Sequence, residues 1–125
     1  MKKIISTDLA PQAIGPYSQA IFANNVLYTS GQIAINPATG LIEEEGIEGQ
    51  TKRVLENLRG ILESVDMKFP DVVKTTVFIK NMQDFAKVNA VYSEYFRDNA
   101  PARSCVEVSC LPKNALIEIE VIAQK

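Results

Sequence analysis

The sequence predicts an α+β domain in which two helices cover one face of a mainly antiparallel sheet. In two segments apolar residues recur every third or fourth position, and the runs around them are rich in β-branched and aromatic residues. These segments follow one another in the order β-β-β-α-β-α-β-β, which is typical of α+β architecture. A chain of 125 residues suits one domain, so residues 1–125 are expected to share one core.

Three strands are expected before the first helix. Ile4–Ile5 and Gln19–Phe22 are predicted to be short strands, joined by the loop Asp8–Ser18 with its two prolines and a glycine. A longer strand, rich in β-forming residues, is predicted over Val26–Ile35. The Asn-Pro-Ala-Thr-Gly run at Asn36–Gly40 predicts a turn after it.

Two amphipathic helices are predicted. The first extends from about Ile47 to Val65, where apolar residues are spaced by three and four and charged residues fill the other side. Asp84 is a suitable N-cap for the second, which must end before Pro101. Its expected buried stripe is Phe85, Val88, Tyr92, Tyr95 and Phe96.

Three further strands complete the predicted sheet, at Val72–Lys80, Arg103–Leu111 and Leu116–Ala123. In the first of them Val73, Thr75, Val77 and Ile79 are expected on one side. Two helices can cover only one face of the sheet, and the second face combines apolar and charged residues. That pattern fits a surface that meets another subunit and keeps polar groups for a site, or else a solvated face.

Composition excludes several classes of function. The formal net charge is −2 and the basic residues form no stripe, which speaks against nucleic-acid binding. The absence of histidine removes Ser-His-Asp catalysis, Cys-His catalysis and histidine-containing metal sites. No apolar run approaches the ~20 residues of a membrane-spanning helix, and the N-terminus has no secretory signal. A soluble cytoplasmic protein is expected.

The two cysteines, Cys105 and Cys110, are expected to stay reduced. Five residues apart on one predicted strand, they would point to opposite faces at a separation of about 17 Å. A disulfide needs Cα atoms within roughly 7 Å.

Arg103 is the first candidate for chemistry. It shares a predicted strand face with Cys105, and Glu118 and Glu120 are expected on the neighbouring strand. A guanidinium in a partly apolar setting can bind a carboxylate by two parallel hydrogen bonds. The alternative is a structural cross-strand Arg–Glu pair, which the spacing alone favours because ion pairs are far commoner than sites.

The other candidates each have two interpretations. Cys105 is a nucleophile only if Arg103 lowers its pKa, and is otherwise a small buried apolar residue. Tyr17, in the Gly-Pro-Tyr-Ser loop, either caps a pocket or packs within the loop. Gly31, in Ser-Gly-Gln, allows either close approach of a ligand or a bulge.

Taken together, these segments resemble the RidA/YjgF family of reactive-intermediate deaminases. The similarity covers essentially the whole chain, and the Pro-Ala-Arg-Ser run with the later Ile-Glu-Ile-Glu strand is its most specific part. The segments that carry it are Ile14–Ala20, Ser30–Ile33, Val73–Ile79, Pro101–Val108 and Leu116–Glu120.

The resemblance implies a chorismate-mutase-like α+β fold and a homotrimer with ligand clefts between subunits. It also implies hydrolysis of 2-imino acids, such as 2-aminoacrylate and 2-iminobutyrate, to 2-keto acids and ammonia, without a metal or cofactor. These imines would come from pyridoxal-phosphate-dependent serine and threonine dehydratases.

By position, the resemblance implies that Arg103 binds the substrate carboxylate and that Glu118 orients the attacking water. The residues it implies as lining the cleft are Tyr17, Ser30, Gly31, Asn89 and Cys105. Gly31 and Cys105 would contribute backbone groups.

Two alternatives to the deaminase remain. One is a non-catalytic sensor of 2-keto acids that uses the same Arg103 clamp but needs no water-positioning Glu118. The other is a ribonuclease or translation inhibitor, an activity attributed to relatives. The acidic net charge and the missing histidine weigh against RNA cleavage.

Overall fold

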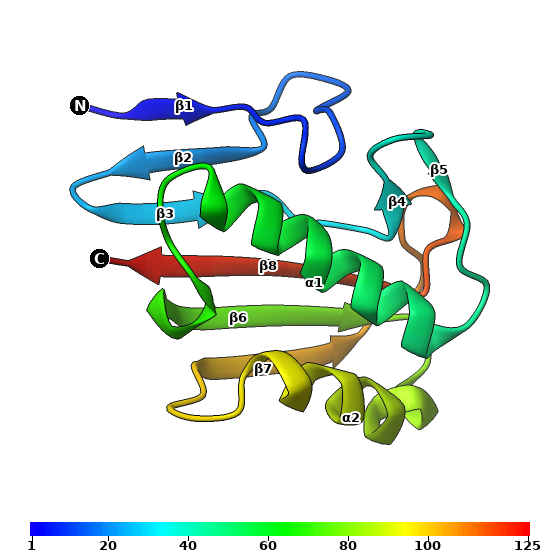
Figure 1. Ribbon diagram of the computed structural model, residues 1–125. Coiled ribbons are helices and arrows are strands. Elements are labelled where there is room, and N and C mark those ends of the chain that lie inside the picture. Colours follow the sequence, from blue (N-terminus) through cyan, green and yellow to red (C-terminus); the bar gives the residue numbers. More distant parts are fainter.

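A computed structural model describes residues 1–125 and confirms the α+β architecture with both helices on one face of the sheet (Figure 1). Neighbouring strands of the six-stranded sheet are antiparallel, except for the parallel pair β6–β7. In spatial order the strands are β1 (Lys3–Ile5), β2 (Ala20–Ala23), β3 (Val26–Thr29), β8 (Ile117–Gln124), β6 (Val72–Ile79) and β7 (Ala102–Glu107).

The core lies between this sheet and the helices α1 (Ile47–Glu63) and α2 (Phe85–Tyr95), which lie in front of the sheet in Figure 1. It is one cluster of 24 buried apolar residues. The stripe predicted for α1 supplies Val54, Leu55, Leu58, Ile61 and Leu62 to it. Burial of each such side chain stabilises the fold by about 1.5–3 kcal/mol relative to exposure.

The strand predicted over Val26–Ile35 is wrong in its second half, because β3 ends at Thr29. Tyr28 pairs with Ile122 but Gln32 pairs with Ile119, so this segment contains one residue more than the β8 segment opposite it. The Thr29 hydroxyl accepts a hydrogen bond from the Val121 N–H at 3.0 Å where the regular ladder is interrupted. The extra residue bends the chain away from the sheet.

Beyond this bend the chain forms a small hairpin that the sequence pattern did not predict. Its strands are β4 (Ile35–Asn36) and β5 (Leu41–Ile42), and they flank the turn that was predicted at 36–40. Strands of two residues are too short to show an alternating pattern, so only the turn between them left a signal.

The strand predicted over Arg103–Leu111 is too long. Its only neighbour in the sheet is β6, which ends at Ile79, and the last ladder contact runs from the Val108 N–H to the Ile79 carbonyl at 2.9 Å. Cys110 therefore lies outside the strand and is exposed, so the strand geometry predicted for the cysteine pair does not apply. Both cysteines are free.

Two details near β6 and α2 also correct the sequence prediction. The register shifts between Val72 and Lys74, so Val72 is 3% exposed and faces the core, whereas Val73 is 46% exposed and does not share the face of Thr75. Asp84 does stand at the N-cap of α2, but its side chain makes no capping hydrogen bond. It ends the 3-10 turn η2 (Met82–Asp84) instead.

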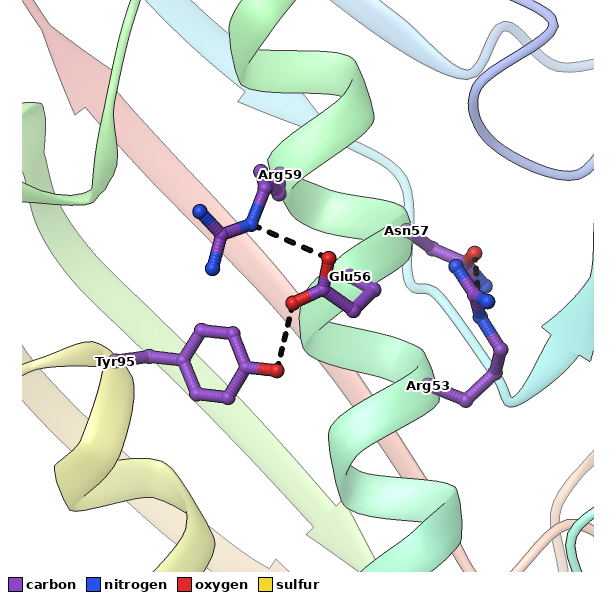
Figure 2. A network of polar contacts seen from close by, with 5 residues as sticks. All are labelled: Arg53, Glu56, Asn57, Arg59 and Tyr95. Carbon is purple, nitrogen blue, oxygen red and sulfur yellow. Dashed lines mark hydrogen bonds and ion pairs between the residues drawn. The ribbon is translucent and has the colours of Figure 1, made fainter.

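A polar contact joins the two helices (Figure 2). The Tyr95 hydroxyl of α2 donates to Glu56 Oε2 of α1 at 2.7 Å, and Arg59 Nε lies 3.3 Å from Glu56 Oε1. Burial, followed by the hydrogen bond to Glu56, raises the pKa of Tyr95 to about 12. The phenol therefore stays protonated and keeps donating throughout the neutral range.

None of the helices has the length and apolar character that crossing a membrane requires.

Candidate functional site

Arg103 and Glu118 lie on opposite faces of the sheet. The prediction that their strands are neighbours is wrong, because β6 stands between β7 and β8. Arg103 is in register with the buried Thr75 on the helix-covered face, whereas Glu118 is in register with Phe78, which points to the open face. Strand spacing and rise place the two Cα atoms roughly 14 Å apart, with side chains directed away from each other.

Arg103 is held against α2. Its Nη1 donates to Asn89 Oδ1 at 2.8 Å, and its guanidinium carbon lies 4.8 Å from the centre of the Tyr92 ring and 5.4 Å from that of Phe85. Cation–π contact with two rings orients a guanidinium without neutralising it. The structure thus brings together two of the predicted site residues, Arg103 and Asn89.

The cross-strand Arg–Glu pair that spacing alone favoured does not form. The single ion pair of the chain joins Arg59 to Glu56 (Figure 2), so Arg103 carries an unpaired charge. A guanidinium has five N–H donors, and Asn89 occupies one of them. The remaining N–H groups can donate two parallel hydrogen bonds to a carboxylate.

Cys105 lies two residues further along β7, half-buried and packed against the core. Burial raises the pKa of its thiol, and the lowering effect of Arg103 does not overcome this. Because the thiolate is the nucleophilic form, this environment favours an unreactive thiol.

A second group of predicted residues lines a cleft of about 370 Å³ at the other end of the sheet. Tyr17 contributes from the loop before β2, Gly31 from the bend after β3, and Glu118 from the beginning of β8. The 3-10 turn η3 (Pro112–Asn114) supplies another wall. Ser30 is not among the lining residues of this cleft, and its hydroxyl donates to the Ser18 carbonyl at 2.6 Å.

Glu118 is half-buried in this cleft and has no partner of opposite charge. Burial raises the pKa of its carboxyl group, and repulsion by Glu120 raises it further. A carboxylate whose pKa is raised accepts a proton more readily than an ordinary glutamate does, which suits a general base.

The backbone of the bend at Gly31 packs directly against the Glu118 carboxylate. A Cβ atom added at residue 31 would lie 2.0 Å from Glu118 Oε2, so the Glu118 carboxylate would have to move to make room for it. The bulge interpretation of Gly31 is confirmed, whereas close approach of a ligand to its backbone stays a prediction.

Sequence reasoning missed the buried amide of Gln19, which holds the wall of the cleft. Gln19 is 3% exposed, and its Nε2 donates to the carbonyls of Thr7, Ala10 and Pro11. Its Oε1 accepts from the Thr7 N–H at 2.7 Å. The Gln19 side chain thus hydrogen-bonds to four backbone groups of the loop before β2, and these bonds hold that loop in position.

Two amides on α1 do the same for the other walls. Gln50 accepts from the Leu116 N–H at 2.9 Å, next to the start of β8. Asn57 donates to the carbonyls of Ile33 and Ile35 on the segment after the bend. Both amides interrupt the apolar stripe of a helix, and that was the signal that could have identified them.

No group of three His, Cys, Asp or Glu side chains lies close enough together to hold a metal ion.

The chain is similar to known proteins along its length. Residues 7–125 match the family model described as endoribonuclease L-PSP. A Salmonella typhimurium protein named 2-iminobutanoate/2-iminopropanoate deaminase is 50% identical over 126 residues, covering 98% of each sequence. A structure of YyfA, a Rid-family protein from Yersinia pestis, is 52% identical with a TM-score of 0.97 and covers 100% of both chains. E. coli TdcF with bound serine is 42% identical with a TM-score of 0.94, covering 98% of both chains.

Proposed function

The chain belongs to the RidA/YjgF family, the endoribonuclease L-PSP family of the matching model, and from this premise we propose that it hydrolyses 2-imino acids to 2-keto acids and ammonia. The proposed sites lie between protomers of a homotrimer. One observation carries the proposal: an arginine without a counter-charge and a carboxylate in a cleft lie on opposite faces of one chain. They can act on one small substrate only if they come from different chains.

The open face of the sheet supports such an assembly. An apolar row crosses it from Ile4 through Ile21 and Tyr28 to Ile122, with Ile4 63% and Tyr28 47% exposed. Contiguous exposed apolar surface is typical of a protein interface. A cyclic arrangement places different patches of two copies against each other, as a site shared between the Arg103 edge and the Glu118 cleft requires.

The proposed reaction needs only the groups described. Arg103 binds the carboxylate of the imino acid and Glu118 positions a water against C2, the electrophilic carbon. As the water oxygen bonds to C2, its proton passes to the Glu118 carboxylate and the C=N electron pair moves to nitrogen. Glu118 returns this proton to nitrogen, which gives a carbinolamine. Glu118 then transfers the remaining hydroxyl proton to the amino group, the C–N bond breaks with its electron pair on nitrogen, and ammonia leaves as the C=O bond forms. Orientation of water and substrate supplies several kcal/mol of the barrier reduction.

Two relatives support this substrate class. The deaminase from Salmonella typhimurium carries its activity in its name, and TdcF from E. coli binds serine, an amino acid whose carboxylate suits an arginine fork. A keto-acid sensor would need Arg103 but not the half-buried Glu118. No feature of this chain favours RNA cleavage, since the net charge is −2 and histidine is absent.

A coupled assay tests the proposal. Purified protein is added to a threonine dehydratase, and release of 2-oxobutanoate is compared with spontaneous imine hydrolysis. The wild type is expected to accelerate release, and Arg103→Ala and Glu118→Gln to lose most of this acceleration. Arg103→Lys is also expected to be poor because it lacks the planar fork. If Glu118→Gln retains the full rate, the carboxylate has no part in the chemistry. If the wild type does not release 2-oxobutanoate faster than spontaneous hydrolysis does, the deaminase proposal fails.

A further inference from the structure

Arg103 rests on a surface of α2 that is built for it. Phe85, Asn89 and Tyr92 follow one another at spacings of four and three, so they form one stripe of the helix that faces β7. All three contact the guanidinium, the rings by cation–π contact and Asn89 by its amide oxygen.

The Tyr92 ring, which lies nearer to the Arg103 guanidinium than the Phe85 ring does, is itself held in place by Thr75. Its hydroxyl shares a 2.7 Å hydrogen bond with Thr75 Oγ1, and the two residues are 7% and 0% exposed. Thr75 stands directly beside Arg103 in the β6–β7 register, and the Tyr92 ring packs 4.6 Å from that of Phe96. Breaking the hydrogen bond of a buried hydroxyl costs free energy. This bond therefore holds the end of the Tyr92 side chain in place, and packing against Phe96 restricts the plane of the ring.

We propose that Tyr92, anchored by Thr75, is a positioning residue that fixes the plane of the Arg103 guanidinium for two-bonded capture of the substrate carboxylate. This inference rests on the proposed role of Arg103. A fork of two parallel hydrogen bonds requires coplanar groups, and a flexible arginine side chain meets that requirement only when its orientation is set before the ligand arrives. The ring orients the cation, and the hydrogen bond orients the ring.

The protonation state of Tyr92 agrees with this role. Burial raises the pKa of its phenol, against the lowering effects of the Thr75 hydrogen bond and of Arg103. The phenol stays neutral near pH 7, so it does not compete with the substrate for the positive charge of Arg103.

The test compares two tyrosines of α2. Tyr92→Leu removes the stacked ring, Tyr92→Phe keeps the ring but not the hydroxyl, and the controls are Tyr95→Leu and Tyr95→Phe, since Tyr95 bonds to Glu56 and not to Arg103. The dissociation constant of 2-oxobutanoate is measured by titration calorimetry on the assembled protein. We expect Tyr92→Leu to raise it about 3- to 30-fold, and Tyr92→Phe about threefold or less. Both Tyr95 variants should stay within about twofold of the wild type.

Non-additivity separates positioning from general damage. In an Arg103→Ala background, Tyr92→Leu should cause no further loss of binding, because its effect passes through Arg103. An equal loss in both backgrounds would overturn the proposal. So would a wild-type dissociation constant in Tyr92→Leu. If that variant does not assemble, Thr75→Val leaves the Tyr92 hydroxyl unpaired at nearly constant volume and is expected to raise the dissociation constant about two- to tenfold. An unchanged value there would also overturn it.

Binding and turnover distinguish this proposal from the proposed function. If the wild type binds 2-oxobutanoate with the expected Tyr92 dependence but hydrolyses no imine, the deaminase proposal fails and the positioning role stands. If it hydrolyses imines but Tyr92→Leu binds normally, only the positioning role fails. A wild type that binds no 2-oxobutanoate removes the Arg103 clamp and the role of Tyr92 with it.

Discussion

The carboxylate of Glu118 lies where the side chain of residue 31 would begin, so that a Cβ on Gly31 would stand 2.0 Å from Oε2. The bend after β3 and the beginning of β8 can therefore pack this closely only because residue 31 has no Cβ atom. The extra residue in the bend after β3 brings Gly31 to this position opposite β8. The position of the proposed catalytic carboxylate therefore depends on the absence of a side chain at Gly31.

Gly31→Ala is expected to displace Glu118 and to lower kcat/KM for imine hydrolysis by about 10²-fold, the usual cost of a misplacement near 1 Å. Steady-state kinetics with the dehydratase-coupled assay measures this. Gly46→Ala is the matched control, since a Cβ there meets nothing within 4 Å. Equal activity of the two variants would show that the carboxylate can relocate without loss.

Glu118→Gln should be more stable than the wild type at pH 7, although we expect it to lose most of the activity. The pKa of Glu118 is raised above its ordinary value of 4.5, first by burial and then by Glu120, so the folded state holds this proton more firmly than the unfolded state. The free energy of unfolding therefore falls as pH rises from about 4.5 through the raised pKa, and stays lower above it. Glutamine removes this loss.

Thermal melts at matched protein concentration at pH 4 and pH 7 check the sign of this effect. The higher melting temperature of Glu118→Gln relative to the wild type should appear at pH 7 and shrink at pH 4. At pH 4 Glu118 is largely protonated in both the folded and the unfolded wild type. Glu120→Gln should act in the same direction, because it removes the second cause of the shift. A wild type that is the more stable protein at pH 7 would contradict the raised pKa.

Two inactive variants should restore each other if the site is shared between chains. In mixed trimers of Arg103→Ala and Glu118→Gln, a site works when one chain supplies Arg103 and its neighbour supplies Glu118. Random assembly at equal amounts makes about one quarter of the sites functional. Co-expressed variants should therefore show about a quarter of wild-type activity per chain, and no recovery would mean that both groups act within one chain or not at all.

Light scattering provides the independent check on assembly. At micromolar concentration the expected mass is about three times the 13.8 kDa of one chain. Replacing the exposed Tyr28 by glutamate on the open face should lower this mass, since it buries a charge in the proposed interface. A stable, active monomer would remove the shared site.

Cys105→Ala should retain activity within about tenfold of the wild type, or about 1.4 kcal/mol of barrier, through altered packing alone. The reason is that burial raises the pKa of the thiol in spite of Arg103. Mass spectrometry of a quenched reaction is expected to show no adduct on the peptide that contains Cys105. A trapped adduct together with a background rate in Cys105→Ala would make the thiol the nucleophile.

Local patterns determined a large part of this fold from the sequence. The spacing of Val54, Leu58 and Ile61 predicted α1 and its buried face, and the Asn36–Gly40 run predicted a turn that the structure contains. These signals are reliable because a helix or a turn is decided by residues within a few positions of one another. The motifs around Gly31 and Arg103 also identify candidate site residues from the sequence alone.

Only the tertiary structure decided how the candidates relate in space. An alternating pattern assigns Arg103 and Glu118 each to a face of its own strand, but it does not say which strands are neighbours or how two faces correspond. The insertion of β6 between β7 and β8 set both, and it separated the two residues across the sheet. Strand pairing of this kind joins residues far apart in the sequence, so it follows from packing of the whole chain and not from any local period.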